Sequence, residues 1–91
     1  MTAGEAREEL AVRVAAAEHL DAEEHRWCAT HPSPRVRRRW ARRPDQDPEL
    51  VLERVAAETD TATLAHLATK AYVVLAAGHE PTADTAASIL A

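Results

Sequence analysis

Helix start and stop signals recur at short intervals along this chain, and they limit it to short helices. Ser33-Pro34 and Asp47-Pro48 each place a capping side chain directly before a proline, which is the arrangement that opens a helix. Pro32 and Pro44 stop the segments before them, because proline lacks the backbone N–H that a helix interior needs. Of the 91 residues only two are glycine and 21 are alanine, and no strand-like alternation occurs. The sequence therefore predicts an all-α protein.

The same signals predict about six helices. Asp21 and Glu24 have the spacing of a capping box, and Asp60 or Thr61 caps the longest helix. Gly78 supplies the left-handed residue expected just after a helix end. Counted with their caps, the expected helices cover residues 5–19, 21–30, 33–43, 47–58, 60–77 and 81–90. A chain of this length has room for one core, so residues 1–91 are predicted to form a single domain.

The composition excludes several classes of protein. Alanine makes up half of the hydrophobic residues and phenylalanine is absent, so no cofactor pocket walled by aromatic side chains is expected. Uncharged runs are too short for a membrane span or a signal peptide. Cys28 is the only cysteine, which excludes an internal disulfide and any multi-cysteine metal site in one chain. We expect no cofactor, no membrane contact and a cytoplasmic location.

Charge is strongly segregated beneath the net value of −4. Residues 1–25 carry a formal charge of −5, residues 26–43 carry +7 without a single acid, and residues 44–91 carry −6. Such blocks either neutralise one another in the fold or present a local field to a partner. The sequence leaves both alternatives open.

Two parts of the chain match each other at an offset of 24 residues. The matching positions are Val12-Arg13 with Val36-Arg37, Ala17 with Ala41, and Asp21 with Asp45. A third, decayed copy begins near Ala62. Short helix pairs cannot bury their apolar faces alone, so a repeat predicts a stack of pairs. The repeat makes Val12 a core residue of the first helix, whereas a helical wheel favours Leu10, Val14 and Ala17. A helix inside a stack is covered on two sides, which allows both sets to be buried, and the repeat is the stronger indication.

Residues 31–37 (HPSPRVR), 41–45 (ARRPD), 47–52 (DPELVL) and 55–56 (VA) carry a family resemblance. Over about residues 20–62 the chain resembles the variant leucine-rich repeat family, which is related to HEAT-like helical repeats. The resemblance implies a right-handed stack of short helix pairs and a role in protein interaction. Arg39 and Trp40 replace the alanine and valine of the family pattern, so packing there must be rebuilt. The cysteine cluster of some members is absent, and its cofactor is not expected.

The arginine-rich helix after Pro34 is the main candidate site. On a helical wheel Val36, Trp40 and Arg43 group together, whereas Arg35, Arg38 and Arg42 line the far side. The predicted partner-binding residues are Arg35, Arg37, Arg38, Arg39, Arg42, Arg43 and Trp40. The simplest alternative is internal pairing with acids of adjacent helices, namely Glu18, Glu23, Glu24, Glu49 and Glu53.

Two further clusters of residues carry side chains that can bind a ligand. His25, Cys28 and His31 recur every three residues and offer zinc-ligand spacing, but a buried, free Cys28 is the more common arrangement. Trp27 and Trp40 can stack on nucleic-acid bases, but they more often anchor a core. Both tryptophans are expected inside.

These observations predict a non-catalytic module, not an enzyme, that binds a protein or peptide through the arginine helix. An acidic partner segment is preferred over nucleic acid, because the net charge is −4 and the sequence pI is near 5.7. The alternative is a small nucleic-acid-binding or regulatory protein that contacts phosphates with the same residues. Self-association is a further expectation, since so short a stack is marginally stable.

Overall fold

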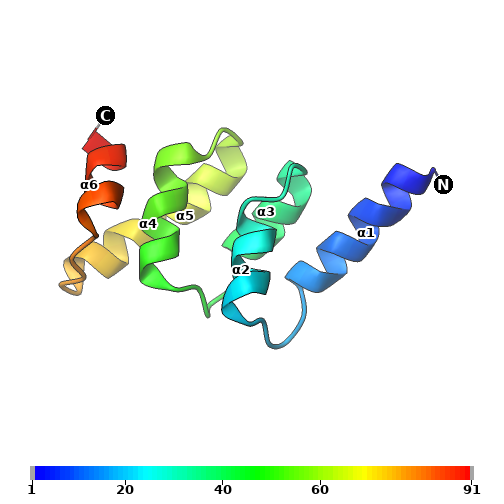
Figure 1. Ribbon diagram of the computed structural model, residues 1–91, viewed down its shortest axis with the longest axis horizontal. Coiled ribbons are helices and arrows are strands. Elements are labelled where there is room, and N and C mark those ends of the chain that lie inside the picture. Colours follow the sequence, from blue (N-terminus) through cyan, green and yellow to red (C-terminus); the bar gives the residue numbers. More distant parts are fainter. Residues whose placement is uncertain (1, 91) are drawn as a thin grey trace. The chain divides into compact units, whose positions relative to one another are not determined.

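Six α-helices and no strand make up residues 2–90, the part of the chain that the computed structural model describes (Figure 1). The helices are α1 (Ala3–Ala15), α2 (Ala22–Ala29), α3 (Pro34–Ala41), α4 (Pro48–Ala57), α5 (Thr61–Ala76) and α6 (Ala83–Leu90). The all-α prediction and the predicted order of helices are confirmed. Internal contacts gather in two units, residues 2–44 with α1 to α3 and residues 45–90 with α4 to α6. No described helix has both the length and the apolar character that a bilayer crossing requires.

The predicted caps begin the helices as expected. Asp21 and Glu24 form a complete capping box, in which Glu24 N donates to Asp21 Oδ1 at 2.8 Å and Asp21 N donates to Glu24 Oε1 at 3.0 Å. Asp47 accepts from the third residue of α4, and Asp60 does the same for α5. Ser33 occupies the cap position of α3 without a side-chain hydrogen bond, so the proline that follows it is the stronger start signal there.

Helices α1, α2 and α3 pack against one another in the N-terminal unit. Its buried apolar residues are Ala11, Ala15, Cys28, Ala29, Val36, Trp40 and Ala41. Both sequence-based expectations for α1 are wrong, because Leu10 is 60% exposed and Val12 is only half-buried. The buried stripe of α1 consists of alanines one turn apart, which allow the backbones of neighbouring helices to approach closely.

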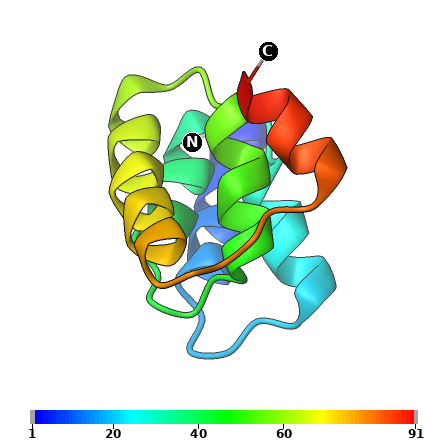
Figure 2. The ribbon, with the colours of Figure 1, turned by 90° about the vertical axis from the view of Figure 1, so that its left-hand side faces the viewer.

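Helix α4 contacts both α5 and α6 in the C-terminal unit. Leu50, Val51 and Leu52 of α4 and Leu67 and Ala71 of α5 are buried. Figure 2 shows α6 beside α4, with residues 77–82 crossing from the end of α5. That crossing begins at Gly78, whose φ of +96° confirms the predicted left-handed residue.

Glu49 fastens this crossing segment to α4. Its Oε2 lies 2.9 Å from His79 Nε2, and its Oε1 accepts a hydrogen bond of 3.0 Å from Thr82 N. The hydrogen bond from His79, followed by the one from Thr82, lowers the pKa of Glu49 from 4.5 to about 2. The ionised carboxylate of Glu49 therefore joins the start of α4 to the start of α6.

Candidate functional site

Helix α3 and the two residues after it divide their charged side chains between two faces. Val36 and Trp40 are 0% and 1% exposed, and Arg43 lies on the same side at 5%. Arg35, Arg38 and Arg42 are exposed, and Arg37 and Arg39 are half-buried. The grouping expected from the helical wheel is therefore present in the structure. The side chains of Trp40 and Arg43 are not accessible to a partner, so the candidate surface is smaller than the predicted set.

Arg43 holds the chain segment that follows α1. Its Nη1 donates to the carbonyls of Ala15 at 2.9 Å and Ala17 at 2.5 Å, and its Nη2 donates to the carbonyl of Glu18 at 3.4 Å. Helix α1 was expected to reach residue 19 but ends at Ala15. The carbonyls beyond that point turn toward Arg43 instead of continuing the helix. A buried cation thus satisfies backbone groups that a helix end leaves without partners.

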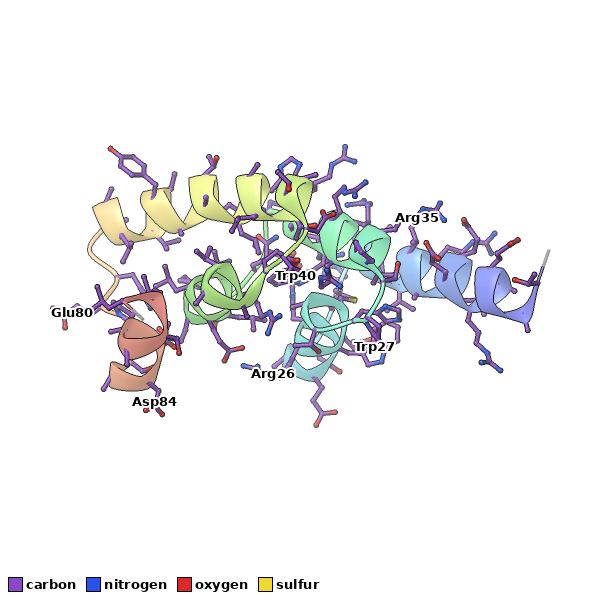
Figure 3. The ribbon with its side chains drawn as sticks, turned by 90° about the horizontal axis from the view of Figure 1, so that it is seen from above. Arg26, Trp27, Arg35, Trp40, Glu80 and Asp84 are labelled. Atoms are coloured by element: carbon purple, nitrogen blue, oxygen red, sulfur yellow. The ribbon has the colours of Figure 1, made fainter. Side chains whose placement is uncertain are left out.

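Trp40 anchors the N-terminal unit through a buried polar contact. Its Nε1–H donates to Nδ1 of His25 at 3.1 Å, and the two rings meet edge to face at 6.5 Å. The expectation that both tryptophans lie in the core is correct for Trp40 but wrong for Trp27, which is 48% exposed (Figure 3). Trp27 instead contacts His31 at the surface, with ring centroids 4.9 Å apart.

The zinc-ligand spacing does not produce a shared site. His25 is engaged by Trp40, and His31 Nδ1 accepts a hydrogen bond from Ser33 N at 3.0 Å. Cys28 is fully buried as expected, and burial raises the pKa of its thiol. Within residues 2–90 no group of three or more His, Cys, Asp or Glu side chains is placed to hold a metal ion.

Arg37 is directed at backbone atoms of its own N-terminal loop. Its Nη1 donates to the carbonyls of His31 at 2.8 Å and Pro32 at 3.0 Å. These bonds fix the turn that leads into α3, so Arg37 also has a structural task.

The remaining four arginines surround one hollow, which we call the arginine cleft. Arg35, Arg38, Arg39 and Arg42 line it together with Val12, and its volume is about 210 Å³. The four positions lie along one side of α3 with helical spacing, and Val12 comes from α1. The cleft thus places four guanidinium groups around one small space.

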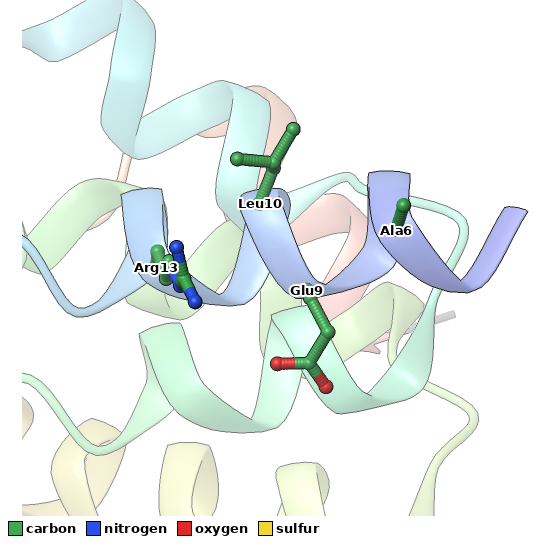
Figure 4. A pocket seen from close by; sticks show the side chains of 4 residues that line it. All are labelled: Ala6, Glu9, Leu10 and Arg13. Carbon is green, nitrogen blue, oxygen red and sulfur yellow. The ribbon is translucent and has the colours of Figure 1, made fainter. Parts of the chain in front are cut away.

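Arg35 is paired with carboxylates at the edge of the cleft. Its Nη1 forms a short ion pair with Glu9 and lies 3.8 Å from Glu8 Oε1. The hydrogen bond to Glu9 is the main cause that raises the pKa of Arg35. Figure 4 shows Glu9 pointing from α1 toward α3, whereas Leu10 points away. Internal pairing therefore exists, but these acids of α1 were not among those that the sequence analysis named.

Arg39 and Arg42 differ from Arg35 in their surroundings. Neither guanidinium has an ion pair or a side-chain hydrogen bond within the described residues 2–90. A guanidinium carries five N–H donors in a planar fork that matches carboxylate and phosphate oxygens. The arginine cleft can therefore accept an anion from outside without displacing an internal carboxylate from either group.

Comparisons with family models, with curated proteins and with solved structures find no match for this chain. A functional assignment consequently depends on the chemistry of the cleft.

Two other hollows lie on the N-terminal unit. One, of about 310 Å³, follows α1 and is lined by Ala6, Glu9, Leu10 and Arg13 (Figure 4). The other, of about 340 Å³, is lined by Val14, Glu23, Glu24 and Trp27. Each contains one exposed large apolar side chain, and neither gathers several arginines as the arginine cleft does.

Proposed function

We propose that this chain is a non-catalytic module that binds an acidic protein or peptide segment in the arginine cleft. The observation that carries the proposal is that Arg39 and Arg42 face the same cleft and neither is paired with a carboxylate of the described chain. Like charges this close repel one another, and an acidic ligand relieves that repulsion. Arg35 supports the choice of ligand, because it already binds carboxylates at the edge of the same cleft.

An acidic protein segment fits this surface better than nucleic acid does. The cleft is confined to one side of α3, and Glu8 and Glu9 lie at its edge. A nucleic-acid backbone needs an extended basic track, and its further phosphates would meet these acids. The net charge of −4 adds to that repulsion.

The proposal includes the repeat architecture. Asp21, Ser33 and Asp47 each precede a helix of 8 to 10 residues, which supports a stack of short helix pairs of the variant leucine-rich repeat or HEAT-like kind. In such repeats function resides on the exposed face of a helix, as it does for the arginine cleft. The reduced, buried Cys28 suits the cytoplasmic location that goes with this proposal.

The test is fluorescence anisotropy with a fluorescein-labelled octaglutamate peptide. We expect saturable binding that weakens steeply with added salt and that falls at least about tenfold in the double variant R39Q/R42Q. The variant R7Q/R13Q is the matched control, because it removes the same charge from exposed positions of α1 outside the cleft. Equal loss in both double variants would show non-specific attraction and refute the proposed site.

A further inference from the structure

The arginine cleft gathers more guanidinium groups than one carboxylate can use, and we propose that its anchor ligand is a phosphorylated serine or threonine side chain. This inference rests on the proposed function, because it names the group within the acidic segment that enters the cleft. Four arginines share a volume of about 210 Å³. Arg39 and Arg42 have no carboxylate partner within the described residues, so a ligand that joins these two groups must concentrate charge and acceptors at one point.

The spacing of the arginines favours a phosphate. Arg38 and Arg42 are one helical turn apart, as are Arg35 and Arg39, and all four side chains line the same hollow. A carboxylate offers two oxygens and one negative charge. A phosphomonoester offers three terminal oxygens and nearly two negative charges, so several forks can donate to it at once.

The ion pair between Arg35 and Glu9 shows how many of the cleft arginines a carboxylate binds. Glu9 meets the single guanidinium of Arg35 at the edge of the cleft, together with the more distant Glu8. Arg39 and Arg42, which also line the cleft, have no carboxylate within the described residues. The part of the cleft that these two arginines line therefore accommodates a ligand of higher charge density.

The same carboxylates restrict the source of the phosphate. A phosphorylated side chain needs to place only one phosphate among the arginines, and the rest of the peptide can turn away from Glu8 and Glu9. A nucleic acid would place further phosphates beside Glu8 and Glu9, where like charges oppose binding. A phosphorylated protein segment is therefore favoured over nucleic acid.

Three labelled octapeptides test the inference by anisotropy with the full chain. Each contains seven glutamates and one variable inner residue, which is serine, phosphoserine or glutamate. A single-stranded oligonucleotide of eight thymidines is the fourth probe. We expect the phosphoserine peptide to bind at least about tenfold more tightly than the all-glutamate peptide. The variant R39K/R42K keeps both charges but removes the forks, so it should retain binding of the all-glutamate peptide and lose most of the phosphoserine advantage. A circular dichroism spectrum confirms that it is folded.

Each outcome has a distinct meaning. Equal affinity for the phosphoserine and all-glutamate peptides overturns the phosphate inference and leaves acidic docking intact. Absence of binding to all three peptides overturns the proposed function itself. Tighter binding of the oligonucleotide than of the phosphoserine peptide overturns both in favour of nucleic acid. An undiminished phosphoserine advantage in R39K/R42K overturns the assignment to these two arginines.

Discussion

The two units of this chain fix the segment after a helix with side chains of opposite charge. In the N-terminal unit the guanidinium of Arg43 binds three backbone carbonyls at and just beyond the end of α1, and the side chain is buried. In the C-terminal unit the carboxylate of Glu49 binds His79 and the backbone of Thr82, and it remains partly exposed. The charge of Arg43 is permanent and lies inside the protein, whereas that of Glu49 is titratable and lies near the surface.

The difference also explains which charges are available for function. The guanidinium of Arg43 donates hydrogen bonds to backbone carbonyls, and so does that of Arg37. Arg39 and Arg42 stand on the other side of the same short segment, without such partners. An arginine-rich sequence is therefore not uniformly a binding surface, because burial assigns some of its members to the fold.

The largest expected effect comes from removing the buried cation. Arg43→Met should lower the free energy of unfolding by about 2–4 kcal/mol, because it leaves the carbonyls of Ala15, Ala17 and Glu18 without their donor. Urea denaturation of both variants measures the loss, and Arg42→Met is the matched control on the exposed side. The control should change stability by no more than about 0.5 kcal/mol. Similar losses in the two variants would contradict the division of the arginines.

A smaller effect on stability is expected for the buried tryptophan, Trp40. Trp40→Phe should cost about 1–2 kcal/mol, because the Nδ1 of buried His25 loses its donor and the smaller ring leaves space. Trp27→Phe, at a half-exposed position, should cost less than half as much. Thermal unfolding followed by circular dichroism compares them. A larger loss at Trp27 would refute the placement of the core.

The hydrogen bonds of Glu49 to His79 and Thr82 predict that stability depends on pH, whereas those of Arg43 predict no such dependence. Since folding lowers the pKa of Glu49 from 4.5 to about 2, its stabilising contribution is complete above about pH 4.5 and is lost as the pH falls toward 2. Glu49→Gln should reduce this part of the acid sensitivity, and Glu80→Gln, at an exposed position, should leave it unchanged. Melting temperatures between pH 2 and 6 provide the measurement. Identical pH profiles for wild type and Glu49→Gln would contradict this role.

The smallest effect concerns the exposed ion pair of the cleft. Glu9→Gln releases Arg35 from its main internal partner and should raise the affinity for octaglutamate by about two- to threefold. The gain is modest because both partners are solvent-exposed. Glu5→Gln removes the same charge from α1 without touching the cleft, so its effect on anisotropy titrations should be smaller. A decrease in affinity in Glu9→Gln would show that Glu9 organises the site instead of competing for it.

Helix boundaries were largely predictable because they are set by local chemistry. The capping box of Asp21 and Glu24, the caps at Asp47 and Asp60, and Gly78 all act within a few residues. The end of α1 was not predictable, because it depends on Arg43, which lies more than 25 residues further along the chain. Sequence patterns within a few residues of a helix end do not indicate a hydrogen-bond donor so far along the chain.

The candidate site was predictable only in part. The helical wheel correctly separated Val36, Trp40 and Arg43 from the outer arginines. It gave no information on which acids would meet Arg35, because the buried face of α1 is marked by alanines instead of its larger apolar residues. Once Ala11 and Ala15 are recognised as that face, the approach of Glu8 to α3 follows, because Glu8 lies about one turn before Ala11, whereas the position of Glu9 does not follow from it.

The most direct test of the division among the arginines is a titration of the side-chain Nε–Hε resonances by NMR. Octaglutamate is added to the ¹⁵N-labelled chain, and each arginine signal is assigned by substitution. We expect the signals of Arg39 and Arg42 to shift with saturation, while those of Arg37 and Arg43 stay in place. Shifts of equal size in all four signals, or in none of them, would contradict this division of the arginines.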